Sequence, residues 1–370
     1  MPFRIAIIGA GWYGCHIGLA LQALGMDVVI FERAHRPFHY ASGNNQFRLH
    51  QGFHYARHHG TRMQSRDGFI RFMERYPTLS ADVAENIYAV PKGSSLMDFN
   101  TYKLIMVSSG LNFVELAPRP ELLRNVEGMV HTHERVILIE RARRYFGEKL
   151  ERALHFNTPV ENIVETEAGV LVNGHLYDYA IDATWGHRGG LPMPVIYEPT
   201  LLLYYEARER VPAVTLVDGP LCSVYPTEDP AIYTLSSVPH TPLGRFDNAA
   251  AAAHCRDSVT ADLVETKRRA METQISVNMP GFGDRFRFMG IQLAMKTKPI
   301  GNFDDRSCHV SRQGRCFVVM SGKIDTIFFA TERILTMIEA TQSDLPAYEG
   351  PGIKQDILAP GAAVSAGRAR

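Results

Sequence analysis

A glycine pattern near the start of the chain constrains its fold more than any other feature. Residues 9–14 read G-A-G-W-Y-G and directly follow a short apolar run. Gly9 permits a tight turn, Gly11 lets a pyrophosphate approach the backbone, and Gly14 lets a helix pack closely on a strand. The N-terminus of that helix supplies unpaired N–H groups and positive potential. The pattern therefore predicts a dinucleotide-binding strand–helix–strand unit over residues 4–33.

An acidic residue closes this unit. Glu32 ends the second expected strand, 18 residues after Gly14. At this position a carboxylate can accept hydrogen bonds from ribose hydroxyls, and it disfavours a 2′-phosphate. The alternative is a glycine-rich turn that binds no nucleotide. NAD and FAD share the fingerprint, so the glycines alone leave both cofactors open.

Charge and cysteine content narrow the class of protein. The chain of 370 residues has 39 basic and 39 acidic residues, which argues against nucleic acid or a membrane as partner and favours a small-molecule substrate. Its five cysteines are scattered without a C-x-x-C pair, which favours reduced thiols over a disulfide or metal framework. The first apolar run is too short for a signal peptide or a membrane span. We therefore expect a cytoplasmic protein that is not exported.

The order of apolar patterns predicts two interleaved lobes. In the first lobe, runs with helical spacing alternate with short buried strands, whereas the second contains closely spaced strand-like runs typical of an antiparallel sheet. We expect one helix over residues 135–154, a strand over 160–164 and one helix over 249–273. We assign residues 1–75, 131–190 and 286–345 to a nucleotide lobe, 76–130 and 191–285 to a substrate lobe, and 346–370 to a flexible tail.

Four stretches lie along the nucleotide lobe at residues 41–46, 159–163, 181–186 and 321–325. Together they resemble segments of FAD enzymes of the D-amino-acid-oxidase-like superfamily. Residues 41–46 read A-S-G-N-N-Q, similar to the small-polar loop that these enzymes place against the pyrophosphate and flavin. Residues 159–163 resemble their adenine-covering strand and residues 181–186 their second cofactor-contacting strand. Residues 321–325 resemble the closing segment beside the isoalloxazine ring. The resemblance implies FAD as cofactor and an α/β fold, in which a Rossmann-type FAD-binding lobe is interleaved with an antiparallel β-sheet substrate lobe.

The fingerprint and the resemblance together define the expected cofactor site. Within the superfamily, residues 45–57 are similar to a bacterial subgroup with the signature N-Q-x-R-L-H-x-G-x-H-Y-x-R. The expected cofactor-binding residues are Gly9, Gly11, Trp12, Tyr13, Gly14, Glu32, Arg33, Ser42, Asn45, Gln46, Arg48, Leu49, Val160, Ala183, Trp185, Gly186, Gly322, Lys323, Ile324 and Asp325.

Histidines gather in the same region, with His50, His54 and His58 four residues apart. A helix would align them for a metal ion, but Gly52 and the preceding polar loop disfavour a helix. No carboxylate accompanies the histidines, so we expect no metal site. Contact with flavin or substrate and a purely structural role both stay open, as does a covalent bond between the flavin and His50.

Cationic and aromatic residues supply the other expected catalytic groups. Lys323 ranks first, because a cation beside the flavin N1–C2=O edge stabilises the anionic reduced ring. Arg48 and Arg57 offer a two-point fork for a carboxylate or phosphate. Tyr55 can orient an amine or a ring, with core packing as the alternative. The expected catalytic residues are Lys323, His54, Tyr55, Arg57 and His50.

The resemblance implies an FAD-dependent oxidoreductase similar to amine and amino-acid oxidases. We expect it to oxidise a C–H bond adjacent to an amine or hydroxyl of an amino-acid-like small molecule, by hydride transfer to flavin N5. The chain has no second G-x-G-x-x-G with strand–turn–helix spacing, so we expect no dedicated nicotinamide domain. The alternatives are a mutase or hydroxylase that uses reduced FAD, and a flavin-binding protein without catalysis.

Overall fold

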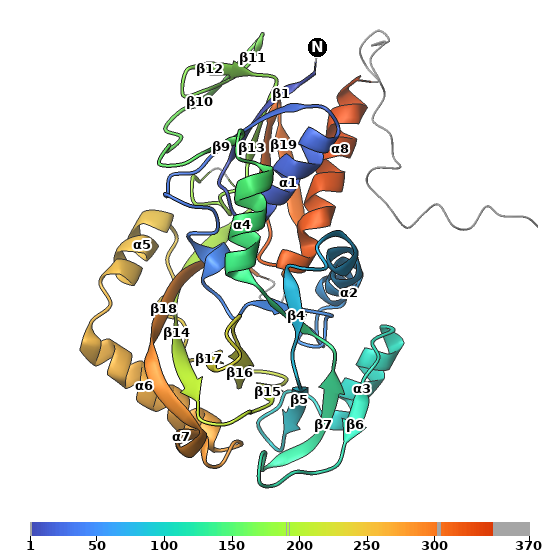
Figure 1. The fold of residues 1–370 in the computed structure, drawn as a ribbon, viewed down its shortest axis with the longest axis vertical. Coiled ribbons are helices and arrows are strands. Elements are labelled where there is room, and N and C mark those ends of the chain that lie inside the picture. Colours follow the sequence, from blue (N-terminus) through green and yellow to red (C-terminus); the bar gives the residue numbers. More distant parts are fainter. Residues whose placement is uncertain (1, 190, 192, 302–304, 343–370) are drawn as a thin grey trace, which may run out of the picture.

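The computed structural model describes residues 2–189, 191, 193–301 and 305–342. Figure 1 shows two lobes along the long axis of the molecule, each built on a large sheet. The six-stranded lobe contains the sheet with strand order β19-β20-β13-β1-β2-β9. The eight-stranded lobe contains the sheet with order β18-β14-β17-β16-β15-β5-β7-β6. Strands distant in sequence are neighbours in both sheets, so the chain passes repeatedly between the lobes.

Parallel pairing forms the middle of the six-stranded sheet. β1 pairs in parallel with both β2 and β13, and β20 extends the sheet in parallel beyond β13. Ile5 and Ile7 pack into one apolar cluster, whereas Ala6 and Ile8 pack into another. Because successive side chains point to opposite faces, a strand covered on both faces is apolar at almost every position. The strands are β1 (Arg4–Ile8), β2 (Asp27–Phe31), β9 (Leu154–His155), β13 (Tyr179–Asp182), β19 (His309–Gln313) and β20 (Cys316–Met320).

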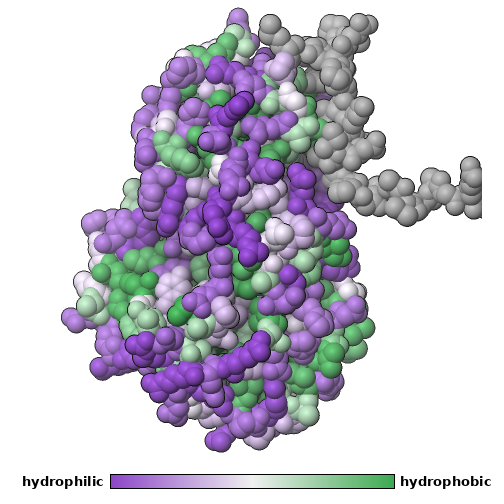
Figure 2. All heavy atoms as spheres, viewed as in Figure 1, coloured by the Kyte–Doolittle hydropathy of each residue, from purple (hydrophilic) through white to green (hydrophobic). Residues whose placement is uncertain are grey.

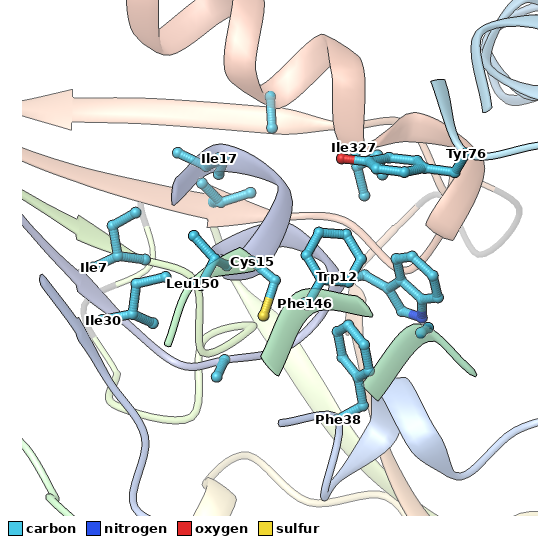
Figure 3. Packing of buried hydrophobic residues seen from close by; sticks show 14 of the residues in the cluster. Ile7, Trp12, Cys15, Ile17, Ile30, Phe38, Tyr76, Phe146, Leu150 and Ile327 are labelled. Carbon is cyan, nitrogen blue, oxygen red and sulfur yellow. The ribbon is translucent and has the colours of Figure 1, made fainter. Parts of the chain in front are cut away.

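Helices cover one face of this sheet and a small sheet covers the other. Ile17 of α1, Phe146 of α4 and Ile334 of α8 share the cluster of Ile5. Figure 3 shows Trp12 beside Phe38 and Phe146 in this cluster; the rings of Trp12 and Phe38 are stacked with centroids 4.8 Å apart. The helices are α1 (Trp12–Ala23), α2 (His59–Arg75), α4 (Ile139–Lys149) and α8 (Ile327–Gln342), and the small sheet is β10 (Ile163–Thr166), β11 (Gly169–Val172) and β12 (His175–Tyr177).

The eight-stranded sheet has its own apolar core. β14 and β18 pair antiparallel along nearly their full length, and β15 pairs in parallel with β5. Met271 and Ile275 of α6 and Phe282 of α7 pack with the sheet in one cluster. The elements are β5 (Asn86–Pro91), β6 (Val114–Leu116), β7 (Val126–Thr132), β14 (Val195–Ala207), β15 (Ala213–Leu216), β16 (Cys222–Pro226), β17 (Ile232–Ser237), β18 (Phe286–Pro299), α3 (Phe99–Ser108), α5 (Ala249–Asp257), α6 (Ala261–Ser276) and α7 (Phe282–Arg285).

Short elements connect the lobes. A second three-stranded sheet has the order β3-β8-β4 and brings the histidine-rich segment beside the end of β7. A 3₁₀ turn, η1, lies in the loop after β2, and a second, η2, immediately precedes α8. These elements are β3 (Arg48–Leu49), β4 (Ser80–Asp82), β8 (Arg135–Ile137), η1 (Ala41–Gly43) and η2 (Ile324–Thr326).

Three local expectations from the sequence are wrong. The helix expected over residues 135–154 begins only at Ile139, because Val136 pairs with both β3 and β4. The helix expected over 249–273 is two helices, since the Thr260 side chain caps the second one by accepting the N–H of Leu263. The strand expected over 160–164 spans Ile163–Thr166, where it pairs with β11.

One segment lies in a different lobe from the one expected. Residues 286–299, assigned to the nucleotide lobe, form β18 at the edge of the eight-stranded sheet. Its charged residues Arg287, Lys296 and Lys298 interrupt the apolar pattern, so the sequence carries no clear strand signal there. The tail expected over residues 346–370 lies outside the described residues.

The surface is polar with scattered apolar areas. Figure 2 shows apolar residues at the surface of the eight-stranded lobe, near α3 on one side and near α5 and α6 on the other. Leu104 and Val107 of α3 are more than half exposed, at 70% and 63%. None of the described helices combines the length and apolar character needed to cross a membrane.

A glycine marks the contact between α2 and η2. A Cβ atom at Gly68 would overlap the carbonyl oxygen of Asp325. We expect Gly68→Ala to lower the free energy of unfolding by about 2 kcal/mol, the typical effect of overpacking a buried contact. Denaturant unfolding followed by circular dichroism measures the change.

Gly147→Ala in α4 is the matched control, because no atom lies within 4 Å of a Cβ placed there. Alanine is the better helix former, so this variant is expected to be up to about 1 kcal/mol more stable than the wild type. Equal destabilisation by both substitutions would contradict a close approach specific to Gly68.

Candidate functional site

A cavity of about 480 Å³ opens at the carboxyl ends of β1, β2 and β13. Ligands of open α/β sheets bind at this edge, where the order of the strands reverses. The cavity brings together fourteen of the twenty residues expected to bind the cofactor: Gly9, Gly11, Trp12, Tyr13, Glu32, Arg33, Ser42, Asn45, Val160, Ala183, Trp185, Gly322, Lys323 and Ile324.

The glycine fingerprint is folded as a site for a pyrophosphate. Gly9 adopts a φ of +99°, and a Cβ at Gly11 would lie 2.8 Å from Ser42 Oγ. That hydroxyl accepts the N–H of Trp12 at the start of α1. Gly14 does not line the cavity; a Cβ there would overlap the carbonyl oxygen of Gly9. The backbone is therefore open to a ligand at Gly11 and packed against itself at Gly14, as expected from the sequence.

Glu32 lines the cavity with both carboxylate oxygens already anchored. Oε2 accepts the N–H of Ala10 at 2.9 Å, and Oε1 accepts the N–H of Ala34 at 2.8 Å. A carboxylate oxygen has two acceptor positions, so each oxygen keeps one for a ligand hydroxyl. This arrangement holds the side chain where a ribose is expected.

Unpartnered polar atoms at the cavity fit a bound dinucleotide. Trp185 Nε1 and His187 Nε2 are buried, and neither atom has a hydrogen-bond partner among the described residues. Burial lowers the pKa of His187 to about 4, so this imidazole is neutral at neutral pH. Sequence analysis missed His187, although it lies two residues after Trp185. Buried polar groups of this kind are normally hydrogen-bonded, and a ligand in the cavity would supply the partner.

Tyr13 fastens the fingerprint helix to the closing segment. Its hydroxyl donates to the carbonyl oxygen of Lys323 at 2.6 Å and lies 2.6 Å from Thr326 Oγ1. Burial raises the pKa of Tyr13, so its hydroxyl stays protonated at neutral pH. Asp325, in the same segment, is buried, and its carboxylate has no hydrogen-bond partner among the described residues.

The other expected cofactor residues do not line the cavity. Leu49 is fully buried in the core, and Gly186 accepts a hydrogen bond from the Tyr197 hydroxyl through its carbonyl. Gln46 accepts a hydrogen bond from Ser223 Oγ of the eight-stranded lobe. Arg48 points toward the same sheet. The six residues outside the lining are Gly14, Gln46, Arg48, Leu49, Gly186 and Asp325.

Beside the cavity, charged and aromatic side chains gather in a group that we call the interlobe cluster, made up of Arg48, His50, His54, Tyr55, Glu134 and Lys323. The cluster contacts the eight-stranded lobe through Thr215 of β15 and Tyr88 of β5. The rings of His50 and His54 lie 5.8 Å apart, and each also contacts the ring of Tyr55. Lys323 Nζ lies 4.1 Å from the centre of the Tyr55 ring. Lys323 also lines the cavity, so it joins the cluster to the cofactor site.

Arg48 is the buried cation of this cluster. Its Nη1 donates to Thr215 Oγ1 at 2.5 Å, and its guanidinium lies 4.2 Å from the centre of the Tyr225 ring. Nε and Nη2 are buried without a hydrogen-bond partner among the described residues. Half of the guanidinium fork is therefore left for an acceptor that the described part of the chain does not supply.

The remaining expected catalytic residues divide between the cluster and the surface. His50, His54 and Tyr55 belong to the cluster, whereas Arg57 forms an ion pair with Asp218 and is 43% exposed. His58 caps α2 by accepting the N–H of Thr61. No group of metal-ligating side chains occurs among the residues that the structure describes.

Sequence analysis missed Glu134, the anion of the cluster. Glu134 lies between β7 and β8 and contacts His50 only because β8 pairs with β3. Arg62 was also missed; it supports the histidine-rich segment by donating to the carbonyl oxygens of Tyr55 and Ala56. Glu134 stands between His133 and Arg135, so its sequence neighbours gave no signal that its side chain is buried.

The anchored carboxylate of Glu32 is testable by cofactor binding. We expect Glu32→Gln to raise the Kd for FAD about 10-fold, because the amide loses the charge and one acceptor oxygen. Titration of the apoprotein with FAD, followed by flavin fluorescence, measures Kd. Glu161→Gln is the control, since this exposed carboxylate also lines the cavity. An unchanged Kd in Glu32→Gln would contradict the assignment of Glu32 to the ribose.

The burial of Lys323 predicts a dependence of stability on pH. Burial lowers the pKa of this lysine to about 7 from its usual 10.5. Between these values the unfolded chain binds a proton that the folded chain has released, so the free energy of unfolding rises with pH. Lys323→Met removes this rise, and Lys92→Met, at an exposed lysine, retains it.

Urea unfolding across this pH range, at fixed excess FAD, compares the wild type with Lys323→Met and Lys92→Met. The expected result is a flatter pH dependence for Lys323→Met than for the other two. If the free energy of unfolding depended on pH in the same way in the wild type and both variants, Lys323 would titrate in the folded protein as it does in the unfolded chain.

Comparison with known proteins agrees with this geometry. The family model described as "DAO: FAD dependent oxidoreductase" matches residues 4–233. The chain is 59% identical over 338 residues to the FAD-dependent monooxygenase FPY4 of Fusarium mangiferae, covering 91% of this chain and 92% of that protein. It is 28% identical over 367 residues to the FAD-dependent monooxygenase kojA of Aspergillus flavus, covering 90% of this chain and 85% of that protein.

A solved structure has the same fold. Glycine oxidase from Geobacillus kaustophilus superposes with a TM-score of 0.70 at 16% identity, covering 95% of this chain and 100% of that one. Both sequence relatives are fungal, whereas the signature over residues 45–57 pointed to a bacterial subgroup. The expected fold class and the expected cofactor, FAD, are confirmed. The chain belongs to the DAO family of FAD-dependent oxidoreductases.

Proposed function

We propose that this enzyme is an FAD-dependent monooxygenase that inserts one oxygen atom of O₂ into a small organic substrate bound at the interlobe cluster. The observation that carries the proposal is the 59% identity, over 91% of the chain, with a protein named as such a monooxygenase. In the reaction one atom of O₂ enters the product and the other leaves as water. This balance requires two electrons and two protons from a reductant.

The position of the cluster supports the proposal. When bound, FAD supplies electron transfer and, in its reduced form, the activation of O₂. The protein has to hold the substrate beside the cofactor, exclude water and place charges around the reacting atoms. Lys323 lines the cofactor cavity and also contacts Tyr55 of the cluster. We assign to Lys323 the role of a cation at the boundary between cofactor and substrate.

A second candidate function is oxidation of a C–H bond adjacent to an amine or hydroxyl of an amino-acid-like molecule. The observation that favours it is the unpaired half of the Arg48 guanidinium, buried in the cluster close to the cofactor site. A guanidinium fork with two free donors matches the carboxylate of an amino acid. In that reaction the substrate itself supplies the electrons.

The state of the cysteines indicates the cellular compartment of the enzyme. All five cysteines are free, and three of them are buried. Reduced cysteines are the rule in reducing compartments. We therefore also propose a cytoplasmic location.

The source of the electrons separates the two candidate functions. For a monooxygenase we expect the FAD-loaded enzyme to consume NADH or NADPH when given its substrate. With isotopically labelled O₂, mass spectrometry then finds one labelled oxygen atom in the product. The substrate panel contains phenols, enols, amines and amino acids.

Anaerobic bleaching of the flavin by an amine or amino acid, without a nicotinamide, would contradict the monooxygenase and establish the second candidate. In that case hydrogen peroxide forms after air is admitted and no label enters the product. Lack of label with every member of the panel, in the presence of either nicotinamide, also counts against oxygen insertion.

A further inference from the structure

A buried carboxylate faces His50 from the segment between β7 and β8. The side chain of Glu134 is fully shielded from solvent. Its Oε1 accepts the N–H of Gln51 at 2.8 Å, and its Oε2 accepts the hydroxyl of Tyr88 at 2.7 Å. Oε2 also lies 3.4 Å from His50 Nδ1. Groups from two separate segments, residues 50–51 and Tyr88 of β5, therefore converge on one carboxylate.

The charges around this pair set its protonation. Burial alone would raise the pKa of Glu134, but His50, Tyr88 and Gln51 outweigh burial and lower it. The carboxylate is therefore ionised at neutral pH. The pKa of His50 is also lowered, first by burial and then by Lys323 and Arg48, although Glu134 acts in the opposite direction. The imidazole is therefore neutral at neutral pH.

The ionised carboxylate selects one tautomer of the neutral imidazole. A carboxylate only accepts hydrogen bonds, so it favours a proton on the ring nitrogen that faces it. In His50 that atom is Nδ1, which is buried and faces no better partner among the described residues. The unprotonated nitrogen is then Nε2. No described residue is hydrogen-bonded to Nε2, and unlike Nδ1 it is not a buried atom without a partner.

We propose that Glu134 is a positioning residue that fixes His50 in this tautomer, so that His50 Nε2 accepts a proton from the substrate. The inference deepens the proposed function and rests on it for the identity of the proton donor. The proton moves from a substrate O–H to Nε2, and the electron pair of the broken bond stays on the substrate oxygen. Glu134 balances the charge of the imidazolium that results.

The surroundings of His50 indicate the class of substrate. Its charged and titratable neighbours are Arg48, Lys323, Glu134, His54 and Tyr55. Arg48 is a cation, Lys323 is a second one below its lowered pKa of about 7, and the one carboxylate is occupied by its own donors. An oxyanion formed by loss of a proton would be stabilised there, whereas an ammonium group would be repelled. We therefore infer a substrate with an acidic hydroxyl, such as an enol or a phenol.

This ionisation fits oxygen insertion. An electrophilic oxygen atom adds most readily to an electron-rich carbon, and loss of the hydroxyl proton raises the electron density on the carbons conjugated with it. His50 would then act before the oxygen atom is transferred, as a general base.

Glu134→Gln tests the inference with little change in side-chain size. The amide presents N–H donors as well as an oxygen, so the ring nitrogen facing it is expected to become the acceptor and Nε2 to carry the proton. Glu198→Gln is the matched control, because Glu198 is equally buried but pairs with Lys298 in the eight-stranded lobe.

The first measurement is ¹⁵N NMR of the full-length, FAD-loaded protein with labelled histidine. The chain has fifteen histidines, and the His50 signals are those missing from His50→Gln. We expect a protonated Nδ1 and an unprotonated Nε2 in the wild type and in Glu198→Gln, and the reverse in Glu134→Gln. The same tautomer in all three proteins, or a protonated Nε2 in the wild type, would overturn the inference.

The second measurement uses the substrate found with labelled O₂. A general base typically contributes on the order of 10² or more in rate, so Glu134→Gln is expected to lower kcat about 100-fold with KM and FAD content unchanged. A loss of FAD, or a fall in kcat no larger than that of Glu198→Gln, would indicate a structural role and contradict the inference. The NMR result needs no substrate, so failure to find oxygen insertion counts against the proposed function alone.

Discussion

The close packing of α1 on the turn after β1 is the constraint on which both the fold and the cavity depend. Any side chain at Gly14 would overlap the carbonyl oxygen of Gly9, so glycine is required for the helix to start where it does. That start directs the helix N-terminus at the cavity, places Trp12 in the core and brings Tyr13 to the closing segment. The remaining walls of the cavity are arranged around this fixed point.

The parts of the fold that the sequence predicted are those in which one local pattern determines the structure. The first strand is apolar at nearly every position because both of its faces are covered, and the fingerprint at residues 9–14 follows it directly. Residues 286–299 were assigned to the nucleotide lobe but form β18 of the eight-stranded sheet, where an edge position and several charges leave a weak strand pattern. The helix expected over residues 135–154 failed in its first turn, where pairing with two distant strands overrides helical spacing.

In the candidate site, too, the sequence predicted the residues that a local pattern positions and missed those that distant strand pairing positions. Residues next to the glycine fingerprint could be placed from the sequence, because a strand–turn–helix unit fixes their positions locally. Glu134 could not be connected with His50, because their contact depends on the pairing of β8 with β3. Arg57 belongs to the signature that gave the resemblance, yet it pairs with Asp218, whose position is set by another lobe. Tertiary contacts of this kind leave no periodic trace in the sequence.

The hydrogen bond from Tyr13 to Lys323 joins residues 310 positions apart. A ribosome therefore produces the glycine fingerprint well before it produces the facing wall of the cavity. Likewise, β1 can pair with β13 only after β13 has been synthesised, and β13 with β20 only after β20 has been synthesised. Because such distant contacts carry the entropy of closing long loops, the nascent chain gains little from the early strand–helix unit alone. Residues 321–324 line the same cavity as the glycine fingerprint, so the complete lining forms only after both segments have been synthesised.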